Sequence, residues 1–162
     1  MPIKVGDKLP NATFRVTTAE GPNKPKTTDE IFKGKKVALF AVPGAYTPTC
    51  TNMHMPSFVK NTDAIKAKGV KDIVVTSTND VFVLKEWLKA TGAEGKVEAL
   101  SDGNAQFAKA IGMDFDGSGR GLGTRTKRYS MLVDDGTVKQ LNLEDQPGQC
   151  TVSGGETLLK QL

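Results

Sequence analysis

Hydrophobic residues in this chain gather in short apolar runs that polar segments separate. The longest run, Val-Ala-Leu-Phe-Ala-Val over residues 37–42, ends at Pro43-Gly44. Its length suits one buried strand and is too short for a buried helix, so it is expected at the centre of a sheet. Further strands are predicted at residues 12–16, 70–76 and 97–100. The polar residues 17–26 between the first two runs read as a turn or an exposed hairpin.

Helical spacing appears between these strands. Residues 28–32 suit one helical turn, and Asn79 is expected to cap a helix with positions 81, 84 and 88 on one apolar face. Asp102 is expected to cap a helix that buries Phe107 and Ile111. Strands that alternate with helices predict an α/β fold with a parallel core sheet covered on both faces.

The pattern changes towards the C-terminus. Residues 128–133 and 138–143 flank Asp134-Asp135-Gly136-Thr137, which is a strong signal for a β-hairpin. Ser153-Gly154-Gly155-Glu156 fits a capping box that opens a last helix over residues 157–162. No linker or repeat interrupts the chain, so residues 1–162 are predicted to form a single domain.

The segment after Pro43 carries the clearest candidate chemistry. Thr47 is expected at the N-cap and Pro48 at the first position of a helix, which puts Cys50 in the first helical turn. Amides without an intrahelical acceptor and the helix dipole favour a thiolate there. Pro56 lies about two turns further on, and a kink is predicted before a helix that continues to residue 68.

Composition narrows the function classes. The chain has 162 residues, of which 38% are hydrophobic and 25% charged, as in a globular protein. No apolar run approaches the roughly 18–20 residues that span a bilayer, and no apolar core of a signal peptide follows Met1, so a cytoplasmic protein without membrane contacts is expected. The net charge of +4 raises the question of nucleic-acid binding, but dispersed lysines among 18 acidic residues and few aromatics favour a solvated surface and no nucleic-acid partner.

The chain has only two cysteines and one histidine. In a cytosolic protein such cysteines are more often redox-active than structural. Without a CxxC or HExxH motif the sequence offers too few ligands for zinc, so neither a metal nor a cofactor is expected. The glycine-rich residues 117–123 match no phosphate-loop motif and lead into a predicted strand, so they are interpreted as a flexible loop before Arg128.

The spacing Pro43…Thr47…Cys50 resembles the PxxxTxxC signature of peroxiredoxins. The longer PGAYTPTC, the following His54 and Pro56, and the distant Lys-Arg-Tyr-Ser-Met at residues 127–131 resemble the type II (Prx5) subfamily. The resemblance runs from Val5 almost to the C-terminus. It implies a thioredoxin-like fold with a mixed sheet and helices on both faces. It also implies a homodimer that packs through loops around the active site.

The resemblance assigns roles to several residues. Cys50 matches the nucleophile that attacks hydrogen peroxide or an alkyl hydroperoxide and becomes a sulfenic acid. Arg128 matches the arginine that stabilises the thiolate and the departing oxygen. Thr47 matches the hydroxyl that contacts the peroxide, and Pro43 matches the residue that shields the thiolate from water.

Two more residues have supporting places. His54 lies four residues after Cys50, on the same helical face, and is interpreted as either a base or an electrostatic neighbour of the thiolate. Tyr46 stands where the subfamily more often has phenylalanine, so its hydroxyl either donates near the site or faces water.

Cys150 allows two mechanisms. In relatives with a resolving cysteine, that residue aligns with Val152, and a shift of two residues moves a sulfur by about 6–7 Å. Disulfide geometry tolerates little of that shift, which favours a one-Cys mechanism. An external thiol, either glutathione with glutaredoxin or thioredoxin, then reduces the sulfenic acid. Cys150 as the resolving residue is the alternative.

Two other functions compete with a thiol peroxidase. A general thiol–disulfide oxidoreductase would explain a reactive cysteine, but the chain has no CxxC motif. A thioredoxin-like binding or chaperone module would make Cys50 incidental. Loss of peroxide consumption on replacement of Cys50 separates the peroxidase from that module.

Overall fold

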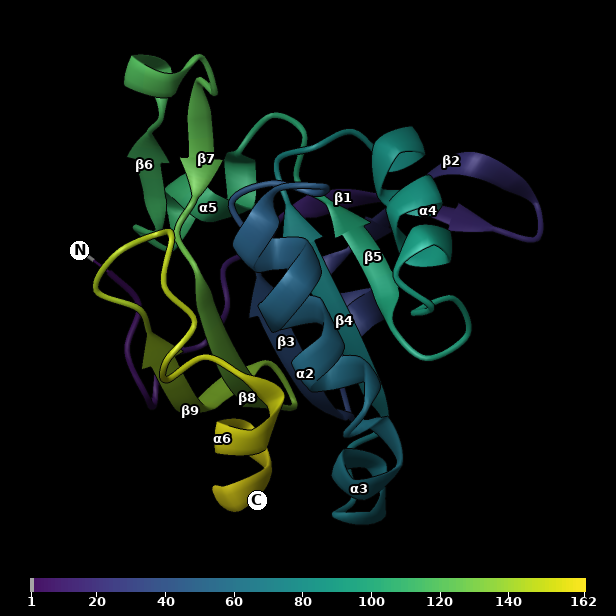
Figure 1. Ribbon diagram of the computed structural model, residues 1–162. Coiled ribbons are helices and arrows are strands. Elements are labelled where there is room, and N and C mark those ends of the chain that lie inside the picture. The colour runs from purple at the N-terminus through teal and green to yellow at the C-terminus, as the bar shows by residue number, and fades with distance from the viewer. Residues whose placement is uncertain (1) are drawn as a thin grey trace.

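The computed structural model describes residues 2–162 and contains a seven-stranded mixed sheet between two layers of helices (Figure 1). Strands β3, β4 and β5 run parallel, and the other neighbours in this sheet are antiparallel. In spatial order the strands are β2 (Gly21–Thr27), β1 (Thr13–Thr18), β5 (Glu98–Ser101), β4 (Asp72–Ser77), β3 (Lys36–Ala41), β8 (Tyr129–Asp134) and β9 (Thr137–Leu143).

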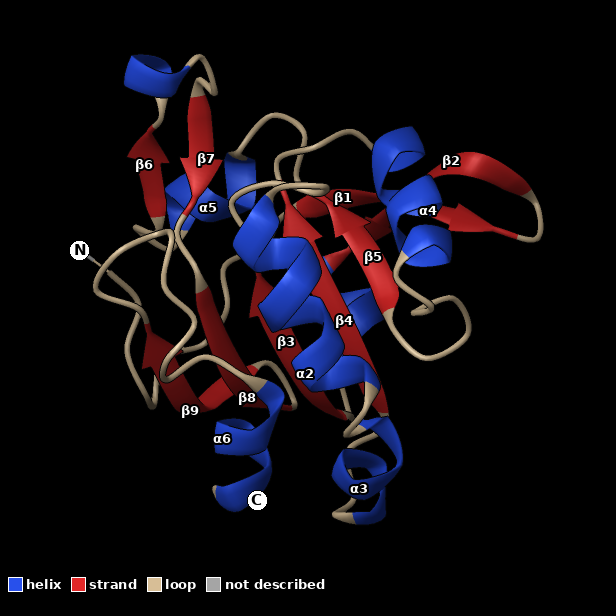
Figure 2. Ribbon diagram, viewed as in Figure 1, coloured by secondary structure: helices blue, strands red, loops and turns tan. Residues whose placement is uncertain are grey.

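The other elements cover this sheet or extend from it (Figure 2). The short strands β6 (Asp114–Asp116) and β7 (Thr124–Thr126) pair with each other in a second, two-stranded sheet. The helices are α1 (Thr28–Phe32), the π-helical turn η1 (Cys50–His54), α2 (Met55–Val59), α3 (Thr62–Ala67), α4 (Val81–Ala90), α5 (Gln106–Ala110), the 3₁₀ turn η2 (Ser118–Arg120) and α6 (Gly155–Lys160). Within residues 2–162, no helix combines the length and the apolar character that crossing a membrane requires.

The central strand β3 divides the apolar core in two, because successive side chains of a strand point to opposite faces. Its odd-numbered residues pack with residues of α1 and α5, including Phe32 and Phe107. The even-numbered residues 38–42 pack on the other face with residues of α2, α4 and α6, including Phe58 and Trp87. Both faces of β3 are therefore buried, which explains its unbroken apolar sequence.

These features confirm the predicted α/β, thioredoxin-like fold with helices on both faces of a mixed sheet. The predicted hairpin is β8–β9, where Asp135 and Gly136 adopt φ angles of 50° and 79°. Two such left-handed residues make the tight turn that suits antiparallel strands. The polar residues after β1 form the hairpin strand β2.

Two predicted helix starts were wrong. The cap of α4 is Asp80, whose carboxylate accepts from the Val83 amide at 2.9 Å, and Asn79 bonds elsewhere. Helix α6 begins at Gly155 after Gly154, and no side chain caps it. The amide and the hydroxyl of Ser153, which was the expected cap, instead both donate to the carboxylate of Glu144.

Asp102 does serve α5, but from further away than predicted. The N-cap position belongs to Ala105, which is left-handed at φ 56°. The Asp102 carboxylate reaches forward to the amides of Phe107 and Ala108 at 3.0 and 2.9 Å. The orphan donors at this helix start are therefore satisfied by a residue outside the helix.

The helix after Cys50 differs most from expectation. It is not one kinked helix to residue 68, because it divides into η1, α2 and α3. In η1 the Met55 amide donates to the Cys50 carbonyl, five residues back. Pro56, which has no amide to donate, follows directly in α2. The wider π turn accommodates the proline where a kink was predicted.

Candidate active site

Strand β3 and the loop after it place Cys50 at the start of a helix. The first backbone bond of this helix runs from the Thr51 amide to the Thr47 carbonyl at 3.0 Å. The Cys50 amide precedes that bond and is one of the donors without an intrahelical acceptor. The Cys50 side chain is fully buried, with 0% of its surface exposed. A buried sulfur at a helix N-terminus lies where negative charge is favoured.

Arg128, which directly precedes β8, brings its guanidinium to this sulfur. Its Nη2 donates to Cys50 Sγ at 2.9 Å, its Nη1 contacts His54 Nδ1 at 2.9 Å, and its Nε donates to the Pro147 carbonyl at 2.9 Å. Only 2% of Arg128 is exposed, and within residues 2–162 no carboxylate forms an ion pair with it. A buried cation without a counter-ion is costly, so this arrangement favours Cys50 as the thiolate.

His54 is neutral in this site. Its Nε2 lies 2.9 Å from the Ser153 carbonyl, which can only accept, so Nε2 carries the proton. Nδ1 is then the lone pair that accepts from Arg128. Burial and, next to it, the Arg128 charge lower the pKa of His54 to about 3. The ring of His54 therefore orients the Arg128 guanidinium. Its lone pair on Nδ1 already accepts from Arg128 and is not available as a base.

Thr47 does not cap the helix with its side chain. Its hydroxyl donates to the Gly44 carbonyl at 2.6 Å, which leaves the lone pairs of the oxygen free to accept. Thr47, Pro43 and Arg128 line one pocket of about 650 Å³. Tyr46 is not among the residues that line that pocket; its side chain is 53% exposed, and its backbone is left-handed with φ 66°.

The glycine-rich loop also lines this pocket. Gly117, Gly119 and Arg120 of the loop lie there, together with Phe115 from β6. The loop precedes β7, so the prediction that it leads into a strand is confirmed. A pocket of this size is much larger than hydrogen peroxide and has room for an organic hydroperoxide or a thiol.

Cys150 lies apart from this pocket. It lines a second pocket of about 420 Å³ together with Asn52 and Met53 of η1 and Pro56 of α2. Both cysteines are free thiols. Burial raises the pKa of the Cys150 thiol, whose nearest polar contact is the Ser153 hydroxyl at 4.0 Å. The structure therefore brings Cys50, Arg128 and His54 together and leaves Cys150 outside that group.

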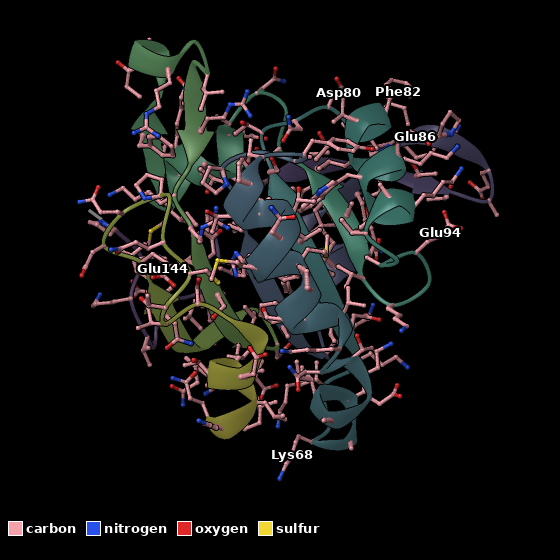
Figure 3. All side chains as sticks on the ribbon, in the orientation of Figure 1. Lys68, Asp80, Phe82, Glu86, Glu94 and Glu144 are labelled. Carbon is pink, nitrogen blue, oxygen red and sulfur yellow. The ribbon has the colours of Figure 1, made fainter. Side chains whose placement is uncertain are left out.

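Three residues that the sequence did not assign to the site hold it in place. Asn79 Oδ1 accepts from the Ala45 amide at 2.8 Å, and Arg125 Nη1 donates to the Pro43 carbonyl at 3.1 Å. Glu144, labelled in Figure 3 beside the C-terminal loop, accepts from Ser153. The sequence gives no local sign of these bonds, because each of them joins residues that are not neighbours along the chain.

Similarity to known proteins agrees with this geometry. The Redoxin family model matches residues 4–159. Peroxiredoxin-2E-2, chloroplastic, of Oryza sativa subsp. japonica is 46% identical, over 99% of this chain and 72% of that protein. Peroxiredoxin-2C of the same organism is 42% identical over 99% of both chains.

Among solved structures, reduced Prx3 of Vibrio vulnificus in complex with H2O2 has a TM-score of 0.93 and 45% identity, over 98% of each chain. The family model and these relatives span nearly the whole of the present chain. The protein therefore belongs to the peroxiredoxins, of the type II (Prx5-like) kind, and is a thiol-dependent peroxidase.

Proposed function

We propose that Cys50 is the peroxidatic nucleophile and that Arg128, Thr47 and Pro43 form the peroxide site around it. The observation that carries this proposal is the 2.9 Å contact between Arg128 Nη2 and Cys50 Sγ. It gives the buried sulfur a fixed cation, and thiolate rather than thiol is the nucleophile. His54 supports the site by holding Arg128, and Tyr46 stands outside the chemical step.

The reaction follows from these positions. The Cys50 thiolate attacks the terminal oxygen of ROOH, an S–O bond forms, and the O–O bond breaks. The products are a sulfenic acid on Cys50 and RO⁻, which takes a proton from water and leaves as ROH. Arg128 stabilises the charge as it passes from sulfur to the departing oxygen. The Thr47 hydroxyl donates a hydrogen bond to the Gly44 carbonyl, so its oxygen is free to accept a hydrogen bond from the O–H of the peroxide. Pro43 keeps bulk water from the sulfur.

Replacement of Cys50 tests this assignment. The Cys50→Ser variant should consume no hydrogen peroxide above background in a colorimetric peroxide assay with excess dithiothreitol. Its circular dichroism should match the wild type, because serine fills nearly the same space. A folded Cys50→Ser protein that still consumes peroxide would overturn the proposal.

We further propose that an external thiol completes the cycle. A thiol R′SH attacks the sulfenic acid to form a mixed disulfide and water, and a second thiol releases R′SSR′ and restores Cys50. The pocket that Thr47, Pro43 and Arg128 line does not include Cys150, which lines a separate pocket, and this supports the one-Cys route. Glutathione with glutaredoxin suits it better than thioredoxin, which would be favoured if Cys150 resolved the sulfenic acid.

Intact mass separates the two routes. After one equivalent of hydrogen peroxide, the wild type and Cys150→Ser should both gain one oxygen, or both dimerise through Cys50. If the wild type instead loses two hydrogens while Cys150→Ser gains one oxygen, Cys150 is the resolving residue and the one-Cys route is wrong.

The assembly and the cellular location are also proposals. The exposed side chains of Tyr46 and Phe82 lie on segments that Asn79 ties together beside the active site, which supports a homodimer packed through these loops. Sedimentation velocity over a range of concentrations tests it, and a monomer at every concentration would overturn it. A cytoplasmic location is proposed from the sequence and is tested by imaging the tagged protein in its own host.

A further inference from the structure

A buried carboxylate that takes no part in the chemical step lies at the start of the loop formed by residues 144–153. Glu144 directly follows β9 and is only 5% exposed. Its Oε2 accepts from the amides of Thr151, Val152 and Ser153 at 2.9, 2.8 and 2.7 Å, and from the Ser153 hydroxyl at 2.6 Å. Its Oε1 accepts from the Thr151 hydroxyl at 2.8 Å. Within residues 2–162 Glu144 has no cationic partner, so these hydrogen bonds alone stabilise its charge.

The carboxylate is ionised at any ordinary pH. Burial by itself would raise the pKa of Glu144, but the hydrogen bonds from Ser153 and Thr151 outweigh it and lower the pKa to about 2. Glu144 therefore gathers the far end of the 144–153 loop around a permanent negative charge.

That loop carries the acceptors that orient the active-site side chains. The Ser153 carbonyl accepts from His54 Nε2, and the Pro147 carbonyl accepts from Arg128 Nε. The Gly148 carbonyl accepts from the Thr49 hydroxyl at 2.9 Å. At the near end of the loop the Glu144 amide donates to the Arg128 carbonyl at 3.1 Å.

The chain of contacts can be followed in both directions from Ser153. Its amide and hydroxyl are held by Glu144, so its carbonyl is fixed towards His54. A fixed carbonyl keeps the proton on Nε2 of the ring and leaves Nδ1 to accept from Arg128. Arg128 then presents Nη2 to Cys50 at 2.9 Å. The loop thus sets both the tautomer of His54 and the direction of the guanidinium.

We propose that Glu144 is a positioning residue of the peroxidase, which fixes the His54 tautomer and the Arg128 fork through the 144–153 loop and so stabilises the Cys50 thiolate. This inference rests on the proposed function of Cys50 and Arg128. Supporting groups of this kind act by geometry, since a displacement of about 1 Å at the reacting atoms lowers rates by about 100-fold.

Two variants separate charge from shape. Glu144→Ala removes all five acceptor contacts and should lower the second-order rate constant for hydrogen peroxide by about 100-fold. Glu144→Gln keeps the shape but loses the charge that strengthens these hydrogen bonds, and should lower that rate constant by about 10-fold. Glu156→Gln is the matched control. It removes a carboxylate of α6 that lies outside the active site and forms an ion pair with Lys60 at 2.7 Å. This variant should leave the rate constant unchanged.

A further readout distinguishes positioning from mere stability. Because His54 is the sole histidine, ¹⁵N NMR reports its tautomer without ambiguity. The wild type should show the Nε2–H form, and Glu144→Gln should show a mixture of both forms.

The outcomes are decisive in each case. An unchanged rate constant and an unchanged tautomer in a folded Glu144→Gln protein would overturn the proposal, even if its melting temperature fell. If Glu144→Ala does not fold, Glu144→Gln alone decides. The tautomer does not depend on activity, so an altered tautomer in Glu144→Gln would stand even if Cys50 proved not to be the nucleophile.

Discussion

The two cysteines of this chain have opposite environments. Cys50 is fully buried, lies at a helix start and touches the guanidinium of Arg128. Cys150 is partly exposed, and its only polar side-chain contact within residues 2–162 is a distant serine hydroxyl. Exposure alone would select Cys150 as the reactive thiol. The cation at the sulfur supports the proposed role of Cys50 instead, because the surroundings of a thiol matter more than its accessibility.

Removal of the cation should make the two cysteines alike. Arg128→Ala deletes the donor to Cys50 Sγ, and the rate constant for peroxide reduction should fall by about 10²–10³-fold. Arg128→Lys keeps the charge but not the planar guanidinium that contacts Cys50, His54 and Pro147 at once. Its rate constant should therefore lie between those of Arg128→Ala and the wild type. Stopped-flow kinetics measures both. An Arg128→Ala protein with an undiminished rate constant would show that the helix start alone activates Cys50.

The neutral state of His54 should appear as a pH dependence of stability. Folding lowers the pKa of His54 from 6.5 to about 3, so between these values the unfolded chain binds more protons. The free energy of unfolding should therefore fall as the pH drops below 6.5, by about 1 kcal/mol per pH unit from this group. Urea denaturation at pH 7, 6 and 5 measures it.

His54→Gln is the control for that experiment, because glutamine offers a donor and an acceptor but does not titrate. The variant should lose less stability than the wild type between pH 6.5 and 4.5. Below pH 4.5 the Glu144 carboxylate, whose pKa folding lowers to about 2, weakens both proteins on further acidification. Equal slopes above pH 4.5 would mean that folding leaves the pKa of His54 unchanged.

The smallest effect is expected at the loop before Cys50. Asn79→Ala leaves the Ala45 amide without its acceptor, which loosens the loop that carries Thr47 and Pro43. The rate constant for peroxide should fall about threefold, a loss equivalent to about 0.6 kcal/mol. The alkylation rate of Cys150, measured by mass spectrometry, should not change. If Cys150 became more reactive as well, the two cysteines would be coupled rather than independent.

The sequence predicted those parts of the molecule that local rules decide. The apolar run of β3 and the Asp135-Gly136 turn have strong local signals, and both were found as expected. The peroxiredoxin motif named Cys50 and Arg128, which the structure brings into contact across 78 positions of sequence.

Other parts depend on contacts between distant segments. The π turn reflects a compromise between Pro56 and the buried position of Cys50, which no helix-capping rule anticipates. Asn79 looked like a cap because Asn often is one, yet its neighbour Asp80 takes that place and frees Asn79 to hold Ala45. Glu144 gave no signal, since a carboxylate after a strand is ordinary until five donors gather around it.

The contact of Arg128 with Cys50 has a consequence for the state after reaction. A thiolate balances the buried guanidinium, whereas a sulfenic acid is neutral and leaves it without a counter-charge. In the proposed reaction, each oxidation of Cys50 therefore removes the charge that the Arg128 guanidinium contacts. The substrate itself then weakens this contact at the stage when a reducing thiol has to reach the sulfur.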